Sequence, residues 1–407
     1  MPDVVKRAGT PADAVDGVVP RFVAEPDSPE AVAATLEWAS RDKLSVLTRG
    51  AGTKFGWGPP LRAIDVLLST ARLNRVVAHR HGDLTATIQA GAPLVLVNRQ
   101  LAEHHQWIPL DPPWADRATI GGLVATNDSG PRRHRYGAPR DLIIGVEFVR
   151  ADGKLAKGGG IVVKNVAGYD LPRLMTGAFG SLAVIVTATF KLFPLTASSR
   201  TLVVELGDPK DLSIVVRKIL ESALTPTAFE FQTPPLRLLI RFESIDAAVE
   251  QQTANAARLI HDSGFASRSV EGSEEEAIWK AHGEPIWTGA GAVLKVTVLP
   301  TDLSAALISL QALAGSAKYV ASGRAGLGVF LAGIQGDVDA EERVVGGLRA
   351  AMPAGRGSVV IVRGSAELKA RTDVWGPIGD GLPLMREVKQ RFDPVGILNP
   401  GRGPGGL

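Results

Sequence analysis

Apolar positions predict a short α/β repeat near the start of the chain. Apolar residues recur at helical spacing from Val32 to Ala39, behind Ser28-Pro29-Glu30, which is typical of a capped helix start. We expect that helix to end at about Lys43. Apolar runs at 44–48 and 64–68 then predict two strands, with a glycine-rich loop between them. This order is a β-α-β unit whose loop follows the carboxyl end of a strand, where α/β folds bind ligands.

The pattern continues with short strands and one helix up to residue 193. Turn residues separate the segments. We expect paired strands at 76–78 and 84–89, a helix at 93–105, a hairpin of 142–149 with 155–156, and a long strand at 182–193.

The pattern of apolar and polar positions changes after about Ser198. Residues 200–370 alternate apolar strands with amphipathic helices, which predicts an α+β domain with a mostly antiparallel sheet. The expected strands are 201–206, 238–242, 292–299, 328–334 and 358–363, and the expected helices are 212–223, 245–263, 303–314 and 340–351. The last segment, 373–407, is a separate tail with a helix at 385–391.

The amino-acid composition excludes several classes of function. The chain has 407 residues, 45% of them hydrophobic, and a net charge of +3, which is too small to indicate nucleic-acid binding. It has no cysteine, and therefore no disulfide, thiol nucleophile or Cys-ligated iron–sulfur cluster. We expect no signal peptide and no membrane span, and hence a cytoplasmic protein that reaches the inner face of the membrane only through partners.

The loop after the first strand carries the clearest chemistry. Glycines at 50, 52, 56 and 58 let backbone N–H groups approach an anion, and Arg49 and Lys54 add positive charge. The loop therefore predicts a pyrophosphate seat, although a glycine-rich turn without a ligand remains the alternative. Neither a Walker loop nor a Rossmann fingerprint fits, because Lys54 precedes Phe55 and the glycines follow Gly-x-Gly-x-x-x-Gly.

Further segments rich in glycine and short polar residues follow along the chain. They are Ala118–Gly130, with short polar groups after Gly121-Gly122; Lys164–Asp170; Thr176–Leu182; and Phe392–Gly401, an extended stretch with one amide. Each alone is compatible with an ordinary loop, and their order is what is informative.

Together these motifs resemble the FAD-binding module of the vanillyl-alcohol-oxidase superfamily. The matching motifs are Arg49–Thr53, Thr119–Gly122, Tyr136-Gly137, Gly168–Asp170 and Phe392–Gly401. The tail motif resembles the glycolate oxidase and D-lactate dehydrogenase branch. Residues 164–171 and 384–389 resemble the FAD-binding E-type subunits of glycolate oxidases.

The resemblance implies a fold and a set of cofactor contacts. The fold is α+β: a PCMH-type FAD-binding domain of two α/β subdomains at 1–198, an α+β cap domain at 199–372, and a tail at 373–407 that returns to the FAD domain. The implied FAD-binding residues are Arg49, Gly50, Ala51, Gly52, Thr53, Lys54, Thr119, Gly121, Gly122, Asn127, Gly130, Tyr136, Gly180, Ile185 and Asn399.

Departures from the family pattern matter as well. The glycine loop has no histidine and the chain has no cysteine, so we expect FAD to bind noncovalently. The metal-binding His-x-Gly-Asp-Gly-Asn-x-His and Glu-His-Gly-x-Gly segments of substrate-oxidising relatives are absent, and no metal site is expected. No catalytic residue is obvious. The candidates are Arg133 and His134, within a basic cluster that could bind a carboxylate or favour reduced flavin, and Tyr169.

The resemblance therefore implies the FAD-binding subunit of a glycolate oxidase complex. Such a complex oxidises glycolate or D-lactate to the 2-oxo acid, with a D-type flavoprotein subunit and an iron–sulfur subunit as partners. This chain would relay electrons through its FAD. One alternative is a stand-alone flavin oxidase of a small hydroxy acid or alditol, and another is a non-enzymatic scaffold with structural FAD.

Overall fold

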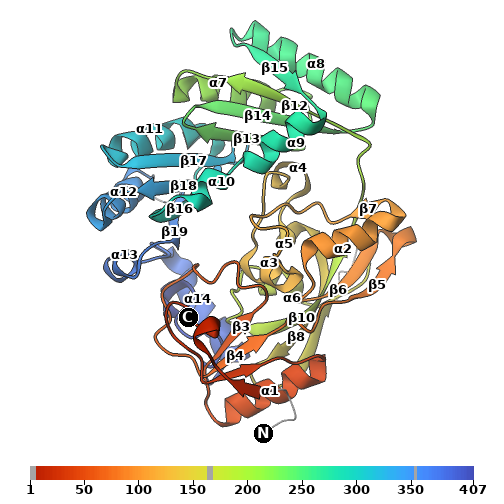
Figure 1. Ribbon diagram of the computed structural model, residues 1–407, viewed down its shortest axis with the longest axis vertical. Helices are drawn as coiled ribbons and strands as arrows, with labels where there is room; N and C mark the ends of the chain where they lie inside the picture. The colour runs from red at the N-terminus through yellow and green to blue at the C-terminus, as the bar shows by residue number, and fades with distance from the viewer. Residues whose placement is uncertain (1–5, 163–167, 353–354) are drawn as a thin grey trace. The chain divides into compact units, whose positions relative to one another are not determined.

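The computed structural model describes residues 6–162, 168–352 and 355–407 (Figure 1). It divides into two units. The first comprises Met1–Gly130, Tyr136–Leu195 and Ile378–Leu407, and the second comprises Pro131–Arg135 and Thr196–Pro377. The first unit is therefore built from three separate stretches of chain. The second unit includes residues 131–135, which interrupt the first unit in the sequence.

The N-terminal part of the first unit is a four-stranded sheet in the order β1-β2-β4-β3. Its strands are β1 (Lys6–Ala8), β2 (Phe22–Ala24), β3 (Val46–Arg49) and β4 (Val66–Ser69). Strands β2 and β3 both pair parallel with β4. Helix α1 (Pro29–Arg41) begins at Ser28, whose hydroxyl accepts a hydrogen bond from the Ala31 N–H, as the sequence predicts.

The rest of the first unit is organised by an antiparallel five-stranded sheet, β5-β6-β10-β8-β9. Its strands and the surrounding elements are β5 (Val76–Arg80), β6 (Thr85–Gln89), β8 (Ile143–Arg150), β9 (Leu155–Gly159), β10 (Ala183–Lys191), the pair β7 (Gln106–Trp107) and β11 (Phe193–Pro194), and the helices α2 (Leu94–Leu101), α3 (Ile120–Thr126), α5 (Pro139–Leu142) and α6 (Leu171–Met175). Residues of β8 and β10 share one apolar core with α1, β3 and β4, so the two sheets are packed together through that helix.

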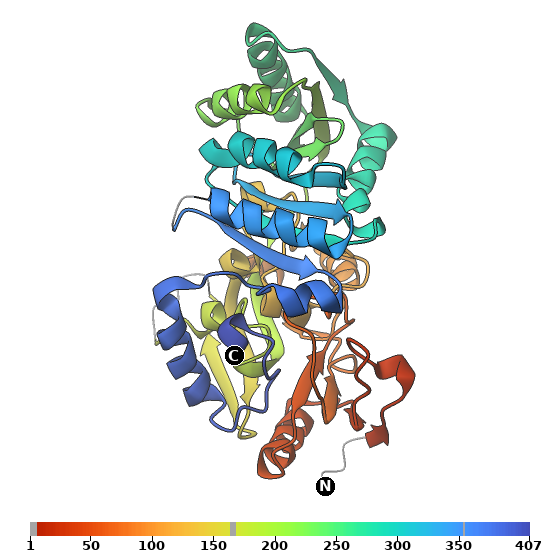
Figure 2. The ribbon, with the colours of Figure 1, turned by 90° about the vertical axis from the view of Figure 1, so that its left-hand side faces the viewer.

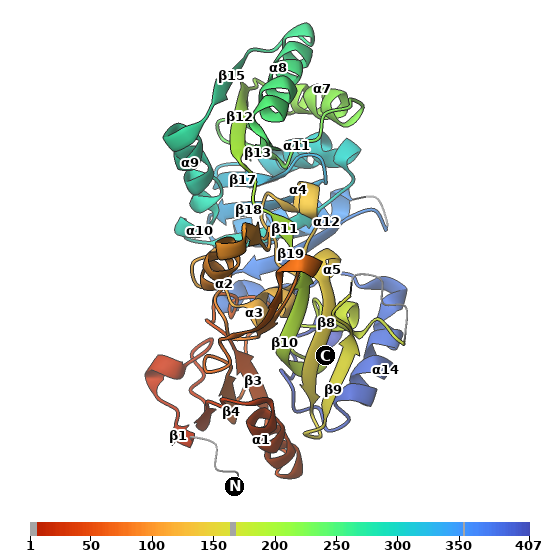
Figure 3. The ribbon, with the colours of Figure 1, turned by 90° about the vertical axis from the view of Figure 1, so that its right-hand side faces the viewer.

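The C-terminal tail closes the first unit. Helix α14 (Leu382–Phe392) runs beside the five-stranded sheet in both side views (Figures 2 and 3), and its Phe392 ring contacts Phe148 of β8. The chain then forms a parallel bridge between Leu398 and Val46 of β3. The tail thus adds a short extension to the edge of the first sheet, at the strand that leads into the glycine loop.

The second unit is one antiparallel eight-stranded sheet in the order β15-β12-β14-β13-β17-β18-β16-β19. The strands are β12 (Ser198–Glu205), β13 (Ala228–Thr233), β14 (Arg237–Ser244), β15 (Ser267–Val270), β16 (Ala292–Thr297), β17 (Lys318–Arg324), β18 (Val329–Gln335) and β19 (Ser358–Arg363). The helices α7 (Pro209–Leu220), α8 (Asp246–Asp262), α11 (Leu303–Ala314), α12 (Val338–Ala351) and α13 (Ala366–Arg371) share with the sheet one large apolar core.

The other face of this sheet carries α9 (Gly272–Ala281) and α10 (Glu284–Thr288), and α9 packs there on a small apolar cluster. Figure 3 shows α9 on the side of the strands opposite α7 and α11. Alternation along the strands brings charged residues to this face, among them Glu230 of β13 and Arg241 and Glu243 of β14. Both glutamates are almost fully buried.

Most predicted elements appear, with differences at their ends. The helix expected at 93–105 is shorter, because α2 ends at Leu101 and one 3-10 turn follows before His105 turns to a φ of 56°. The tail helix is longer than expected and starts at Leu382. Strands β13, β15 and β17 escaped the sequence pattern. None of the helices in the described part of the chain combines the length and the apolar character that a bilayer span requires.

Candidate functional site

A cavity in the first unit gathers most of the residues that the sequence motifs single out. It encloses about 850 Å³, counting the part open to solvent. The predicted residues in its wall are Gly50, Ala51, Gly52, Thr53, Lys54, Thr119, Gly121, Gly122, Gly180, Ile185 and Asn399. They come from the loop after β3, the start of α3, the strand β10 with the turn before it, and the tail.

Close backbone approach explains the glycines of this wall. A Cβ on Gly50 would lie 2.2 Å from the Thr119 hydroxyl oxygen, and a Cβ on Gly121 would lie 2.7 Å from the Cβ of Ala90. Gly52 has a φ of +72°, which side chains disfavour. Thr119 is the N-cap of α3, and its hydroxyl accepts a hydrogen bond from the Gly122 N–H at 3.4 Å. Close packing against Thr119 and Ala90 therefore requires glycine at positions 50 and 121, and both glycines line the cavity.

The two cations expected at the loop are both paired. The Lys54 ammonium lies 3.1 Å from the Asp128 carboxylate, and both side chains are more than nine-tenths buried. Arg49 is not among the described residues in the cavity wall, and its guanidinium lies 3.4 Å from Asp13. Asp13 also binds Arg7 through two hydrogen bonds, which hold the pKa of that carboxyl well below its usual range. The positive charge at this site is thus more neutralised than the sequence suggests.

Asn399 links the tail to two other walls of the cavity. Its side-chain oxygen accepts from the Thr48 N–H at 3.3 Å, and its side-chain nitrogen donates to the Phe179 carbonyl. A Cβ on Gly180 would lie 2.7 Å from that nitrogen. The amide singled out in the sequence therefore ties β3 to the turn before β10.

Arg402 is a wall residue that sequence reasoning missed. It is almost fully buried, and its guanidinium donates to the carbonyls of Phe55, Trp57 and Pro59 and pairs with Asp16 at 2.8 Å. Burial lowers the pKa of Arg402, and Asp16 opposes that shift. The sequence did offer one signal for Arg402. It lies three positions after Asn399, in a tail that is expected to return to the FAD domain. Other unpredicted wall residues are Leu47, Thr48, Phe55, Trp57, Thr70, Ala90, Ala125, Thr126, Phe179, Ala183 and Val184.

Three predicted cofactor residues serve the surrounding structure. Asn127 ends α3 with a φ of 49°, and its side-chain oxygen accepts from the Arg140 N–H at 3.2 Å. Gly130 passes so close to Asp111 that a Cβ would meet the Asp111 carbonyl oxygen at 1.7 Å. The Tyr136 ring packs edge-on against Trp107 and Phe193. None of the three is among the described residues of the cavity wall.

The catalytic candidates lie in different units. Arg133 and His134 belong to the second unit, where they open the short helix α4 (Arg133–Tyr136), and Tyr169 belongs to the first. Tyr169 is 89% exposed, and residues 163–167 of its motif lie outside the described part of the chain. His134 packs edge-on against Phe229, with ring centroids 5.8 Å apart. Burial lowers the pKa of His134, so the imidazole is neutral at pH 7.

The cavity suits a flavin dinucleotide. The Thr48 hydroxyl in its wall is buried and has no hydrogen-bond partner among the described residues, so a ligand can supply one. Bare backbone at Gly50 and Gly121 fits a pyrophosphate, and the aliphatic and aromatic wall, which includes Ile185 and Phe179, fits a ring system. The donor set and the shape therefore agree with FAD. Within the described ranges, no group of three His, Asp or Glu residues is placed to hold a metal ion.

Comparison with known proteins agrees with this geometry. Residues 20–159 match the family described as FAD binding domain, and residues 378–402 match the C-terminal domain of FAD linked oxidases. The two matched segments contain the glycine loop, the Thr119–Gly122 segment and Asn399. They thus meet at the cavity although they lie at opposite ends of the chain.

Relatives with assigned names cover nearly the whole chain. Glycolate oxidase subunit GlcD of Bacillus subtilis is 27% identical over 94% of this chain and 89% of its own length. Glycolate oxidase subunit GlcE of Escherichia coli is 28% identical over 93% of this chain and 98% of its own. Among solved structures, alkyldihydroxyacetonephosphate synthase superposes with a TM-score of 0.74 at 17% identity, over 94% of this chain and 77% of that one. The predicted fold class is confirmed.

Proposed function

We propose that this chain, which belongs to the FAD-linked oxidoreductases of the vanillyl-alcohol-oxidase type, is the FAD-binding subunit of a complex that oxidises a small 2-hydroxy acid such as glycolate. The observation that carries this proposal is the convergence of Gly50, Gly121 and Asn399 on one cavity. Segments of chain far apart in sequence, which lie in the two matched family domains, meet there.

The residues of the cavity would bind different parts of FAD or hold the cavity wall in place. Backbone N–H groups at Gly50–Thr53 and at Gly121-Gly122 would hold the pyrophosphate, and Thr48 would donate its unused hydroxyl hydrogen bond. Asn399 would keep the flavin end of the cavity closed by holding β3 to the turn at Phe179. When bound, FAD supplies the two-electron acceptor that turns a 2-hydroxy acid into a 2-oxo acid.

We propose noncovalent attachment of the cofactor. A covalent bond to flavin would need a nucleophilic side chain such as cysteine, histidine or tyrosine in the wall, and none of the described wall residues is a tyrosine. The chain has no cysteine, and none of the described wall residues is a histidine. Affinity then rests on the backbone contacts and on the tail, which makes the cofactor removable without breaking a bond.

The subunit role is supported by the relatives and by composition. Two relatives are named as subunits of glycolate oxidase, and their likeness extends over nearly the full chain. Because this chain cannot ligate an iron–sulfur cluster through cysteine, such clusters would belong to a partner. We therefore propose a cytoplasmic chain that works with a D-type flavoprotein and an iron–sulfur subunit and relays electrons through its own FAD.

One observation favours a second candidate, a chain that oxidises the hydroxy acid by itself. The His134 Nδ1 is buried and lacks a hydrogen-bond partner within the described residues, and the imidazole is neutral. A neutral imidazole with an unused nitrogen is the usual acceptor for a hydroxyl proton.

The experiment is reconstitution from purified chains. The chain alone should bind FAD and turn yellow, show little turnover of glycolate with an artificial electron acceptor, and become active when the D-type and iron–sulfur partners are added. Turnover by the chain alone would select the second candidate. A colourless protein that takes up no FAD in calorimetry would contradict both.

A further inference from the structure

Residues 50–61, which we call the cofactor loop, have no regular structure of their own. The structure describes every residue in this range, and the chain forms neither a helix nor a strand there. The loop lines the cavity from Gly50 to Phe55 and again at Trp57. An irregular loop keeps one shape only when contacts from other segments offset the loss of backbone freedom. The source of those contacts therefore decides how the loop meets its ligand.

Arg402 of the tail supplies contacts to the second half of the cofactor loop. Its guanidinium donates hydrogen bonds to the carbonyls of Phe55, Trp57 and Pro59, the last two at 2.6 and 3.1 Å. Its side chain is 7% exposed, and the residue lines the same cavity. Hydrogen bonds from a charged donor are stronger than those between neutral groups, and burial strengthens them further. These three bonds therefore define the path of the loop from 55 to 59.

The same bonds fix the direction in which the peptide groups of the loop point. A trans peptide unit is planar, so its N–H points opposite to its C=O. Because the carbonyls of Phe55 and Trp57 point at Arg402, the N–H groups of Gly56 and Gly58 point away from it. A loop binds phosphate through the direction of its N–H groups. Arg402 thus orients the kind of group on which anion binding depends.

Asp16 completes the contact at the end of the cofactor loop. Its carboxylate accepts from the Arg402 guanidinium at 2.8 Å and from the Leu61 N–H at 3.2 Å. The main chain of Arg402 also passes close to the loop, since a Cβ on Gly58 would lie 2.8 Å from the Arg402 carbonyl oxygen. Arg402 therefore contacts the loop with its side chain and its main chain, and Asp16 neutralises its charge.

A tight turn places Arg402. Its N–H donates to the Asn399 carbonyl at 3.2 Å, across Pro400 and Gly401. Proline at the second position and a glycine with positive φ at the third, here +77° at Gly401, are typical of a type II β-turn. The turn holds the side chains of Asn399 and Arg402 in a fixed relation. Since Asn399 binds the Thr48 N–H just before the loop, one turn holds the loop at its start and near its end.

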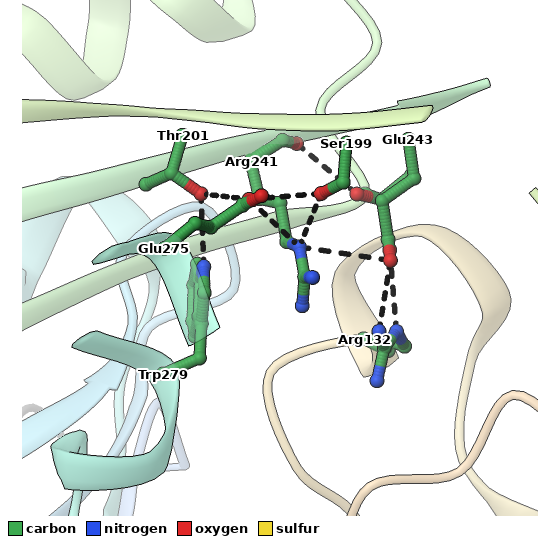
Figure 4. A network of polar contacts seen from close by, with 8 residues as sticks. Arg132, Ser199, Thr201, Arg241, Glu243, Glu275 and Trp279 are labelled. Carbon is green, nitrogen blue, oxygen red and sulfur yellow. Dashed lines mark hydrogen bonds and ion pairs between the residues drawn. The ribbon is translucent and has the colours of Figure 1, made fainter. Parts of the chain in front are cut away.

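Arginines in the polar network of the second unit are bound differently. Figure 4 shows Arg132 donating two hydrogen bonds to the Glu243 carboxylate, and Arg241 between Glu243 and Glu275. These arginines pair with side-chain carboxylates, the strong and common arrangement for a guanidinium. Arg402 adds to its carboxylate partner the main chain of a loop. Its bonds therefore select a backbone shape, which is what a ligand of that backbone requires.

We propose that Arg402 is a positioning residue for the cofactor. Through the Asn399–Arg402 turn, the tail holds the cofactor loop in the shape that binds FAD, and bound FAD in turn holds the tail in place. The two effects are equal in size, because a coupling free energy between two sites is reciprocal. The inference rests on the FAD site of the proposed function and makes no use of the hydroxy acid.

The first arm of the test measures FAD affinity of the full chain by calorimetry. Arg402→Lys keeps the charge and loses the planar fork that reaches several carbonyls, so FAD should bind at least about 30-fold more weakly. Arg402→Ala should show a similar or larger loss. Guanidinium ion, added far below denaturing concentrations, should restore part of the affinity of Arg402→Ala. An arginine with a purely structural role would lower stability in urea and leave the FAD affinity of the folded protein unchanged.

The second arm measures hydrogen exchange of the tail with and without FAD. In the wild type, FAD should slow the exchange of amides at 397–402, where the Arg402 N–H closes the turn. In Arg402→Ala this effect of FAD should be lost, since the side chain that connects the tail to the loop is missing. The exchange arm needs neither substrate nor partner subunits.

Two matched pairs of variants control for general damage. Gly401→Ala strains the turn without a steric clash, because φ is +77° and the added Cβ would meet nothing within 4 Å. It should speed exchange at 397–402 about tenfold and weaken FAD binding. Gly379→Ala, with a φ of +67° and equally open space in the same tail, should do neither. Arg363→Lys alters an arginine that also binds loop carbonyls, at Trp287 and Gly291, and it should leave FAD affinity unchanged.

The outcomes separate this inference from the proposed function. A wild-type chain that takes up no FAD would contradict both. A wild-type chain that binds FAD, with an equal affinity in folded Arg402→Lys, would overturn the positioning role alone. FAD binding that leaves the exchange of 397–402 unchanged would overturn the coupling. If Arg402→Ala fails to fold, Arg402→Lys and Gly401→Ala decide, and a chain that binds FAD without oxidising glycolate would leave the inference standing.

Discussion

Asn399 and Thr48 lie 351 positions apart in the sequence, and the side-chain oxygen of Asn399 accepts a hydrogen bond from the Thr48 N–H at 3.3 Å. The backbone N–H of Asn399 also donates to the Val46 carbonyl at 2.8 Å. Because Thr48 stands in β3 just before the glycine loop, the tail sets the position of the strand end from which that loop departs. Two segments far apart in the sequence therefore line one cavity.

The first prediction concerns this link. In Asn399→Ala two hydrogen bonds are lost, each worth about 1 kcal/mol, so FAD should bind about 30-fold more weakly in a calorimetric titration. Val395→Ala is the control, since Val395 is an exposed residue of the same tail. Equal FAD affinities in the two variants would show that Asn399 does not contribute to FAD binding.

The second prediction concerns backbone approach at the loop. Gly50→Ala places a Cβ 2.2 Å from the Thr119 hydroxyl, so the loop and α3 must separate and FAD binding should fall by more than about 100-fold. Gly82→Ala is the matched control, because its Cβ would meet nothing within 4 Å. Fluorescence of bound and free flavin measures both. A Gly50→Ala protein with wild-type affinity would show that the loop does not contact the cofactor.

The third prediction concerns the attachment of the flavin. Denaturing the yellow protein in acid and centrifuging it should leave all the flavin in the supernatant, because no cysteine exists and no histidine is among the described wall residues. Absorbance at the flavin band of the washed pellet is the measurement. Colour that stays with the protein would refute noncovalent binding.

The fourth prediction concerns the anchor of the tail. Asp393 is 1% exposed, its carboxylate accepts from the N–H groups of Gly396, Ile397 and Leu398, and it pairs with Lys389 at 2.6 Å. Asp393→Asn leaves Lys389 as a buried charge without its carboxylate. The stability of the first unit should fall by about 3 kcal/mol in urea denaturation, and FAD affinity should fall with it.

Asp380→Asn, at an exposed carboxyl near the start of the tail helix, serves as the reference. We expect it to change stability by less than about 0.5 kcal/mol, as most exposed substitutions do. Similar urea midpoints for the two variants would show that the Lys389–Asp393 pair does not hold the tail.

The fifth prediction concerns pH and Glu243. Burial raises the pKa of Glu243, but the hydrogen bonds from Arg132 and the charge of Arg241 outweigh it, so the pKa lies below its ordinary value of 4.5. A carboxyl whose pKa is lower in the folded state stabilises the fold above its unfolded pKa, and this contribution is lost as pH falls through the folded pKa. The stability difference between wild type and Glu243→Gln should therefore be constant above about pH 5.5 and shrink below pH 4.5, as measured by urea denaturation across that range. A difference that grows on acidification would contradict the ion pair.

The sequence was a good guide where chemistry and geometry are local. Ser28 caps α1, as predicted, because a cap depends on residues within one turn of the helix. The sequence singled out the glycines at 50 and 121 for the approach of an anion, and the structure shows that close contacts with Thr119 and Ala90 also leave no room for a side chain there. Arg402 escaped attention, because a buried arginine looks like a surface one until its partners are known.

The sequence was a poor guide where partners are distant. It suggested that Arg49 and Lys54 bring free positive charge to the loop, whereas Asp13 and Asp128 pair with them. It gave no indication that residues 131–135 join the second unit, or that Glu243, 111 positions from Arg132, holds them there. It also missed β13, β15 and β17, whose pairing with other strands stabilises them more than their own composition does.

By itself, the sequence determined the elements, the caps and the glycine positions, because these depend on backbone sterics and on neighbours a few residues away. The tertiary structure decided which charges are neutralised and which glycines line the cavity. The physical reason is that electrostatic pairing and burial act through space. Their strength at Arg132 or Lys54 is set by groups that the chain brings near only when it has folded.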